Sequence, residues 1–289
     1  CGSRVGRARQ VAGVRAAHYG EGATIGGTLA AGLSGPRRAA AGSARDFVLG
    51  MRVVNGRGQV LRFGGEVIKN VAGYDVSRLM VGAFGALGVM LEASFKVLPR
   101  PVCERTVVHA APDAAQAIQR LREWALMPQP ISASAWHEGR LYLRLSGSEA
   151  AVRQAAAGPL GGEEVAEGVA FWHQLREQQL AFFDDARPLW RISVPPAATL
   201  LPDSFVAAKD RIVEWDGALR WVKTRAAVRD MFAAAAERGG HAMLYRNAAS
   251  NARGRRQPLP PPLLALHKRV RAALDPHGIF NSGCLYTEL

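Results

Sequence analysis

Three glycine-centred segments lie close together early in the chain, at residues 22–28, 35–46 and 82–89. Glycine permits positive φ and has no Cβ, so successive backbone N–H groups can converge on an anion or lie against a flat ring. A nucleotide offers both surfaces. One such segment would predict only a tight turn, but three together favour a nucleotide-binding site. The Gly82, Gly85, Gly88 spacing is not a Rossmann fingerprint, because no strand-loop-helix unit with the required glycine order surrounds it.

The residues around these segments predict a short helix and a hairpin. Thr24 is a suitable N-cap for a helix over residues 26–33, although the glycines there lower helix propensity and indicate that close approach is needed. Residues 48–55 and 59–63 predict two strands joined by a tight turn.

A further strand is predicted over residues 89–98, where apolar and polar side chains alternate. The alternation indicates a more deeply buried face, formed by Val89, Leu91, Ala93, Phe95 and Val97.

A domain boundary is predicted near Arg100 and Pro101, because the glycine density falls there and longer helical patterns begin. The next elements are expected in the order strand 105–110, helix 114–126, strand 132–137, strand 140–146 and helix 149–157. This is the order of a ferredoxin-like split unit. A similar succession follows: strands 189–194 and 219–223, helix 225–238, strand 241–245, a surface loop at 247–262 and a helix at 263–274. The fold class is therefore predicted to be α+β.

The chain of 289 residues is long enough for two domains and carries a net charge of +13. The charge is dispersed, and its short arginine clusters lack the interleaved aromatics that stack on single-stranded bases, so nucleic-acid binding is disfavoured. A positive field equally suits an anionic cofactor, an acidic substrate or an acidic partner. No apolar run is long enough to cross a bilayer, and residues 1–10 lack the apolar middle of a secretory signal. A cytoplasmic location is expected.

The residue types that commonly bind metals or transfer protons are scattered. Cys1, Cys103 and Cys284 have no paired spacing for zinc or an iron-sulfur cluster, so no metal site is predicted. The seven histidines form no close pair. The sequence therefore assigns no catalytic residue.

Residues 22–46, 69–79 and 82–89, in this order, closely resemble the second FAD-binding subdomain of the vanillyl-alcohol-oxidase, or PCMH, type. Within that superfamily, residues 69–79 and 33–38 are most similar to the smaller, FAD-binding subunit of bacterial glycolate oxidase. The resemblance is strong over about residues 20–101 and weak over the domain that follows. It returns at the tail, Phe280, Asn281, Ser282 and Gly283.

The resemblance implies FAD as cofactor and assigns site residues by position. The segment 22–28 would run beside the pyrophosphate and flavin, 42–46 and 82–89 would hold the nucleotide through backbone groups, and 73–75 would support the pocket. Asn281 would approach the flavin from the C-terminal segment, although Ser282 replaces the usual proline. The implied cofactor-binding residues are Gly22, Ala23, Thr24, Gly26, Gly27, Thr28, Gly42, Ser43, Asp46, Gly73, Tyr74, Asp75, Gly82, Gly85, Gly88, Val89 and Asn281.

The family begins with a further subdomain whose glycine-rich loop holds the FAD pyrophosphate, and residues 1–17 are expected to contain no counterpart of it. The expected organisation is an irregular leader at 1–19, an incomplete PCMH-type FAD-binding domain at 20–101 and an FAD-linked oxidase-like cap domain at 102–289. Losing the loop would remove several charge-assisted contacts, each worth about 1.5–3 kcal/mol. Weak FAD binding by the isolated chain is therefore expected.

The resemblance implies oxidation of glycolate or another 2-hydroxy acid, with flavin as hydride acceptor. The Gly-Asp-Gly-Asn-x-His pattern of the larger flavoprotein subunit is absent from the sequence. This chain is therefore not expected to perform the oxidation alone. The resemblance implies that its partners are that larger FAD-linked subunit and an iron-sulfur subunit, with membrane contact only through the complex. Two alternatives remain: a self-sufficient FAD-dependent 2-hydroxy-acid dehydrogenase, and a non-catalytic assembly subunit with a degraded flavin site.

Overall fold

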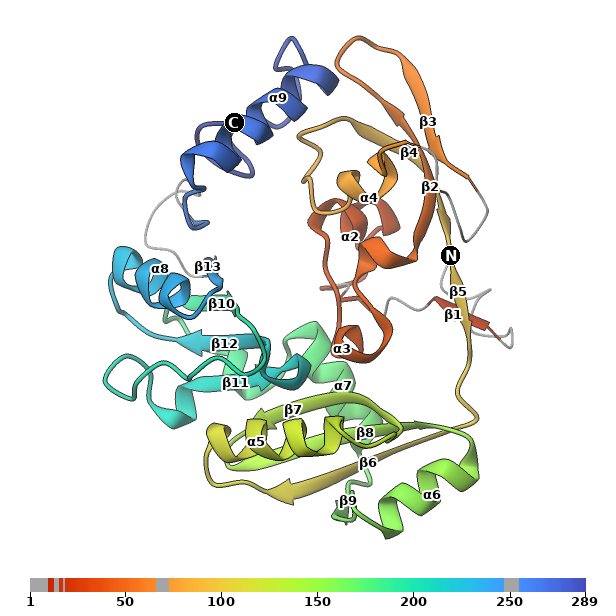
Figure 1. Ribbon diagram of the computed structural model, residues 1–289, viewed down its shortest axis with the longest axis vertical. Coiled ribbons are helices and arrows are strands. Elements are labelled where there is room, and N and C mark those ends of the chain that lie inside the picture. Colours follow the sequence, from red (N-terminus) through yellow and green to blue (C-terminus); the bar gives the residue numbers. More distant parts are fainter. Residues whose placement is uncertain (1–9, 13–15, 18, 66–72, 247–254) are drawn as a thin grey trace. The chain divides into compact units, whose positions relative to one another are not determined.

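The computed structural model describes residues 10–12, 16–17, 19–65, 73–246 and 255–289, with side chains for all of these except 10–12. The chain divides into two compact units, whose elements are labelled in Figure 1. Unit 1 comprises Cys1–Gly35, Ala41–Arg100 and Pro258–Leu289, and unit 2 comprises Pro36–Ala40 and Pro101–Gln257. Residues 69–72 of the predicted site and 247–254 of the predicted loop lie outside the described residues. Among the residues described, no helix is long and apolar enough to cross a membrane.

Unit 1 contains an antiparallel sheet of three strands in the order β3-β2-β4. The strands are β2 (Val48–Val54), β3 (Val60–Gly64) and β4 (Val89–Phe95). Asn55 closes the predicted hairpin turn, because its side-chain oxygen accepts hydrogen bonds from the Arg57 and Gln59 N–H groups, both at 3.0 Å. The inner face of β2 is apolar and packs in a core with short helices, which include α2 (Ile25–Ala31) and α4 (Val76–Met80).

The segment expected to be an irregular leader contains a strand. Residues Gln10–Ala12 form β1, which pairs antiparallel with β5 (Val97–Pro99). This pairing was not predicted because a three-residue strand has almost no local sequence signal, and its partner supplies the hydrogen bonds.

The predicted burial of alternate residues holds for Ala93 and Phe95 of β4, which pack against the core of unit 1, but is wrong for Val89 and Leu91 of β4 and for Val97 of β5. Val89, Leu91 and Val97 are exposed, whereas Met90 packs against the core of unit 1. The cause is an irregularity in the pairing with β2, where Arg52 faces Glu92 but Val53 faces Met90. Leu91 is thus an extra residue that breaks the two-residue period, as in a β-bulge.

The C-terminal residues belong to unit 1, so the expectation of a single domain over 102–289 is not met. Helix α9 (Pro261–Leu274) ends where the Gly56 N–H donates to the Leu274 carbonyl oxygen at 2.8 Å. Buried Asp275 follows, and its carboxylate accepts hydrogen bonds from the Ile279 and Phe280 N–H groups at 3.1 and 3.0 Å. The tail is therefore fixed to unit 1 by backbone contacts, which sequence composition does not reveal.

Unit 2 is built on an antiparallel sheet of eight strands in the order β13-β10-β12-β11-β7-β8-β6-β9. Its strands are β6 (Cys103–Ala110), β7 (Ile131–His137), β8 (Arg140–Gly147), β9 (Glu163–Glu164), β10 (Leu189–Ser193), β11 (Arg211–Glu214), β12 (Leu219–Lys223) and β13 (His241–Arg246). The β6-α5-β7-β8-α6 order follows the predicted ferredoxin-like unit.

Helices cover both faces of this sheet. One apolar cluster joins β6, β7 and β8 to α5 (Ala114–Ala125) and α6 (Glu149–Ala157). A second, aromatic cluster lies under α7 (Gly168–Glu177), and a third lies under α8 (Val228–Glu237). A short helix, α3, spans Arg38–Ala41. Short 3-10 helices are found at η1 (Ala44–Phe47), η2 (Ala181–Phe183), η3 (Ala208–Asp210) and η4 (Trp215–Gly217). The fold is α+β, as predicted.

Candidate functional site

The segment 22–28 at the start of α2 presents an open backbone surface. Thr24 is the N-cap, and its Oγ1 accepts a hydrogen bond from the Gly27 N–H at 3.0 Å. Residues 22–27 are exposed. A Cβ atom on Gly22 would meet no heavy atom within 4 Å, and one on Gly26 would meet only Thr24 Oγ1 at 4.0 Å. Close packing within the protein therefore does not explain these glycines, and a flat or anionic group has direct access to the backbone.

The glycine loop, defined as residues 82–88, packs directly on α2. The Gly82 N–H donates to the Leu29 carbonyl oxygen at 2.9 Å, and the Phe84 N–H donates to the Ala30 carbonyl oxygen at 2.8 Å. A Cβ on Gly32 would lie only 2.9 Å from Gly82 Cα. The structure thus brings two of the predicted site segments together, and glycine is needed where their backbones meet.

Asn281 joins the same region from the C-terminal tail. Its Nδ2 donates to the Phe84 carbonyl oxygen at 2.7 Å, and a Cβ on Gly85 would lie 2.8 Å from that nitrogen. Gly85 has φ +71°, a left-handed conformation that suits glycine. The side chain of Asn281 therefore holds the tail against the glycine loop.

At the end of the loop, Gly88 has φ +151° and a Cβ there would lie 2.7 Å from the Val54 carbonyl oxygen. Glycine is required here by contact with β2. Val89 follows as the exposed first residue of β4.

The predicted segment 42–46 uses its polar groups internally. Ser43 donates from both N–H and Oγ to Asp46 Oδ2, at 2.7 and 2.6 Å, and the Ala44 N–H donates to Ser34 Oγ at 3.0 Å. Burial acts to raise the pKa of Asp46, but the two Ser43 bonds together with the charges of Arg45 and Arg78 lower the pKa below its ordinary value. Gly42 takes φ +101° beside the Asp46 side chain. These groups shape a turn, and their donors are already engaged within the protein.

The segment 73–75 leads into α4. Gly73 has φ +80° and open space at its Cβ position, and Tyr74 is 98% exposed. Asp75 is the N-cap of α4 and accepts a hydrogen bond from the Arg78 N–H at 3.0 Å. Gly73 and Tyr74 are therefore accessible to a ligand, whereas the Asp75 side chain caps α4.

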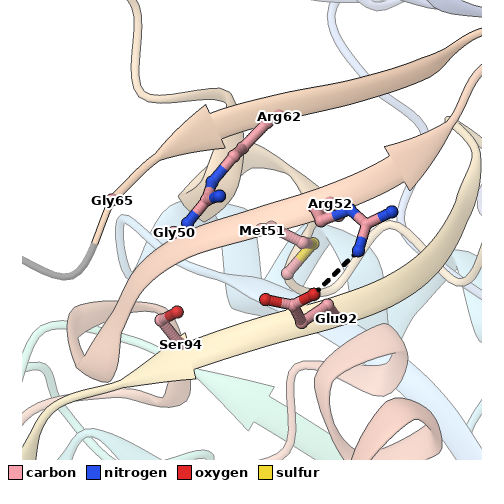
Figure 2. Close-up of a pocket in the computed structure, with 7 residues that line it drawn as sticks. All are labelled: Gly50, Met51, Arg52, Arg62, Gly65, Glu92 and Ser94. Carbon is pink, nitrogen blue, oxygen red and sulfur yellow. Dashed lines mark hydrogen bonds and ion pairs between the residues drawn. The ribbon is translucent and has the colours of Figure 1, made fainter.

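A small hollow lies on the sheet of unit 1, away from the residues predicted for the site. It is lined by Gly50, Met51, Arg52, Arg62, Gly65, Glu92 and Ser94. Figure 2 shows Arg52 paired with Glu92, at 3.0 Å, and the Arg62 side chain extending toward Gly50. None of the predicted cofactor-binding residues lines this hollow.

Unit 2 contains a polar cluster that the sequence did not reveal. The guanidinium carbons of Arg38 and Arg191 lie 4.5 and 5.3 Å from the centroid of the Trp215 ring. Next to Trp215, the Glu214 carboxylate is buried and accepts a hydrogen bond from Trp221 Nε1 at 2.8 Å. Burial raises the pKa of Glu214 to about 7, although the Trp221 bond and the charge of Arg191 oppose the change. The only sequence signal here is the Asp216-Gly217 turn.

FAD fits the donor set in unit 1. The open glycine backbone at 22–28 suits a pyrophosphate or a flat ring, the glycine loop contacts the other end of the same helix, and Asn281 is hydrogen-bonded to that loop. An ammonium-rich or carboxylate-rich pocket, which would suit other ligands, is not formed by these described residues. Bound FAD would meet mainly backbone groups here, with Asn281 as the side-chain contributor.

Comparison with known proteins agrees with this fit. The FAD binding domain family matches residues 3–64, a match that begins inside the segment for which no counterpart was expected. Glycolate oxidase subunit GlcE of Escherichia coli (strain K12) is 47% identical over 272 residues, which cover 94% of this chain and 74% of that protein. Glycolate oxidase subunit GlcD of Bacillus subtilis (strain 168) is 42% identical over 85 residues, which cover 29% of this chain and 18% of that protein.

The fold has a solved counterpart. A structure of alkyldihydroxyacetonephosphate synthase superposes with a TM-score of 0.62 at 16% identity, over 96% of this chain and 61% of that chain. The chain thus spans less than two thirds of this solved relative, and the likeness concerns the fold alone. Because the match to GlcE covers 94% of this chain and 74% of that protein, and the FAD binding domain family also matches, this chain is an FAD-binding flavoprotein of the family of glycolate oxidase subunit GlcE.

Proposed function

We propose that the chain is the FAD-binding subunit of a glycolate oxidase complex, which oxidises glycolate or a similar 2-hydroxy acid to the 2-oxo acid, glyoxylate in the case of glycolate. The observation that carries the proposal is the open glycine backbone at the start of α2, the helix whose far end contacts the glycine loop, to which Asn281 is hydrogen-bonded. The 47% identity to a glycolate oxidase subunit supports the choice of substrate class. FAD, when bound, supplies the acceptor for the hydride of the CH–OH group.

The contribution of this chain's own residues is to hold and orient the cofactor. The α2 start would carry the cofactor through Gly22, Ala23, Gly26 and Gly27, which have space for a close approach. Asn281 would keep the C-terminal tail against the glycine loop through its bond to the Phe84 carbonyl. The Gly42, Ser43 and Asp46 turn and the Gly82 and Gly88 backbone would support the site by shape, because their groups are engaged within the protein.

The partners in the proposal are a larger FAD-linked subunit and an iron-sulfur subunit. The similarity over 85 residues to GlcD, which is likewise a subunit of a glycolate oxidase, supports an oxidase that is built from more than one subunit. The iron-sulfur subunit follows from the family resemblance. The proposed location is the cytoplasm, with any membrane contact made through the complex.

The experiment is a visible absorption spectrum of the purified chain, alone and with the partner subunits, compared with the Gly26→Val variant. Valine is no worse than glycine in a helix, so α2 is retained while the added side chain blocks the open backbone. Gly65→Val is the control, because the Cβ position of Gly65 is also open but lies outside the predicted site.

We expect bound flavin in the complex, its loss or marked reduction in Gly26→Val, and normal flavin in Gly65→Val. Flavin in the isolated chain would show, in addition, that this chain needs no partner subunit to bind FAD. Absence of flavin from this chain in every preparation would refute the proposal and favour a non-catalytic assembly role.

A further inference from the structure

The glycine loop contains one strained residue, which is held from two sides. Phe84 has φ +51°, a left-handed conformation that is unfavourable for a residue with a Cβ atom. Its N–H donates to the Ala30 carbonyl oxygen of α2 at 2.8 Å, and its own carbonyl oxygen accepts from Asn281 Nδ2 at 2.7 Å. Such a conformation persists where its surroundings impose it. Asn281 therefore helps to fix the backbone shape of the loop.

The position of Asn281 is fixed in turn by the residue before it. The Phe280 N–H donates to Asp275 Oδ2 at 3.0 Å, and the Phe280 carbonyl oxygen accepts from Arg271 Nη2 at 2.8 Å. Both backbone polar groups of Phe280 are thus bound to charged side chains, which form stronger hydrogen bonds than neutral partners do. The backbone that carries Asn281 is held by Arg271 and Asp275.

Arg271 and Asp275 are themselves anchored in unit 1. The Asp275 side chain has no exposed surface, and its Oδ2 lies 3.7 Å from Arg271 Nη2. Gly56 of the hairpin turn leaves no room for a Cβ atom beside Asp275, and its N–H donates to the Leu274 carbonyl oxygen at 2.8 Å. A continuous series of contacts thus runs from the hairpin turn through the tail to the glycine loop.

We propose that Arg271 and Asp275 are positioning residues for the cofactor site. They set Asn281 against the glycine loop and through it hold the loop in the shape that retains FAD. Neither residue is among those that the family resemblance assigns to the site, and both act through the backbone of the tail. The inference rests on the proposed function, because FAD is the ligand whose retention it concerns.

The test compares Arg271→Ala, Asn281→Ala and the double variant with the parent, in the complex loaded with FAD. Release of flavin is followed by the rise in fluorescence of free FAD after dilution. Amide hydrogen exchange of residues 82–88 is measured separately on the flavin-free chain, so that the loop is also observed without the cofactor. Asp275→Asn keeps the shape of the carboxylate but loses one acceptor.

Two further variants separate the positioning role from a general effect. Arg271→Lys keeps a charged donor and tests for rescue. Arg269→Ala is the matched control, because Arg269 is an exposed arginine of the same helix. Circular dichroism establishes that each variant is folded.

We expect FAD release to become roughly tenfold faster or more in Arg271→Ala, and faster in Asp275→Asn, in line with the loss of a charge-assisted hydrogen bond. Exchange of residues 82–88 should also be faster in both. Arg271→Lys should restore most of the parent's behaviour, and Arg269→Ala should match the parent. Because Arg271 acts through Asn281, the double variant should release FAD no faster than the more affected single variant.

Release at the parent's rate in Arg271→Ala, or unchanged exchange of the loop, would overturn the positioning role. Effects that multiply in the double variant would do the same, because they would show that the two residues act independently. A parent complex that holds no flavin would contradict the proposed function, and exchange of the loop in the flavin-free chain would then decide the positioning role by itself.

Discussion

The buried carboxyl of Glu214 is expected to make folding depend on pH in a way that a single substitution removes. Its pKa is raised from 4.5 to about 7 in the folded protein, chiefly by burial. Between these values the folded state keeps a proton that the unfolded state has lost, so the free energy of unfolding falls as the pH rises. At about 1.4 kcal/mol per pH unit, the loss across this window is about 3 kcal/mol. Above pH 7 the contribution is constant.

Glu214→Gln should therefore remove this slope and be more stable than the parent at pH 8, because a neutral amide needs no deprotonation in the interior. Its side-chain oxygen can still accept from Trp221 Nε1, which donates to Glu214 at 2.8 Å. Urea denaturation followed by tryptophan fluorescence at several pH values between 4.5 and 8 measures the difference between the two proteins. That difference isolates Glu214, since all other titrating groups are shared.

Glu163→Gln, in the exposed strand β9, is the matched control and should follow the parent. If the stability of Glu214→Gln changed with pH in parallel with the parent, the carboxyl would not be titrating in this window. The argument from burial would then be wrong.

Three further changes test the geometry. Gly56→Ala should destabilise the protein by about 1–3 kcal/mol in urea denaturation, because its Cβ would lie 2.4 Å from Asp275 Oδ1, whereas Gly65→Ala, with open space, should change stability by less than about 0.5 kcal/mol. Asn281→Ala should speed amide hydrogen exchange in the C-terminal tail by removing its bond to the glycine loop, and unchanged exchange would show that the bond is dispensable. Asp113→Ala removes the N-cap of α5, and a loss of about 1 kcal/mol is expected by the same denaturation; no loss would mean that the cap does not contribute.

Local signals predicted much of the secondary structure. Thr24 caps α2, the hairpin turns at Asn55, and α9 occupies the predicted C-terminal helix, because each depends on residues a few positions apart. Strand β11 was missed, since Arg211 and Glu214 at its ends suggest a surface segment. All four of its residues are buried. Arg211 donates a hydrogen bond to Asp203, and Glu214 accepts one from Trp221, and sequence periodicity cannot identify these partners.

The site was predicted unevenly for a similar reason. Open glycines at the start of α2 were recognised because a dense run of glycine has few structural explanations. The hydrogen bonds between Ser43 and Asp46 form a local capping arrangement, and the binding role assigned to this segment stays a prediction. The cluster around Trp215 was not predicted, because Arg38 and Arg191 reach it from distant parts of the sequence and the Asp216-Gly217 pair indicates only a turn.

Unit 1 is completed by residues from both ends of the chain, and this affects the order in which the protein can be made. The strands β2, β3 and β4 leave the ribosome before unit 2, but Val270 and Leu274 of α9, which pack on the core of unit 1, are synthesised only after residues 101–257 of unit 2. Unit 2, apart from residues 36–40, is continuous over Pro101–Gln257 and can mature during translation. Part of the apolar core of nascent unit 1 therefore stays exposed until α9 has been synthesised. Unit 1 is thus the part of the chain that most needs protection from aggregation before release.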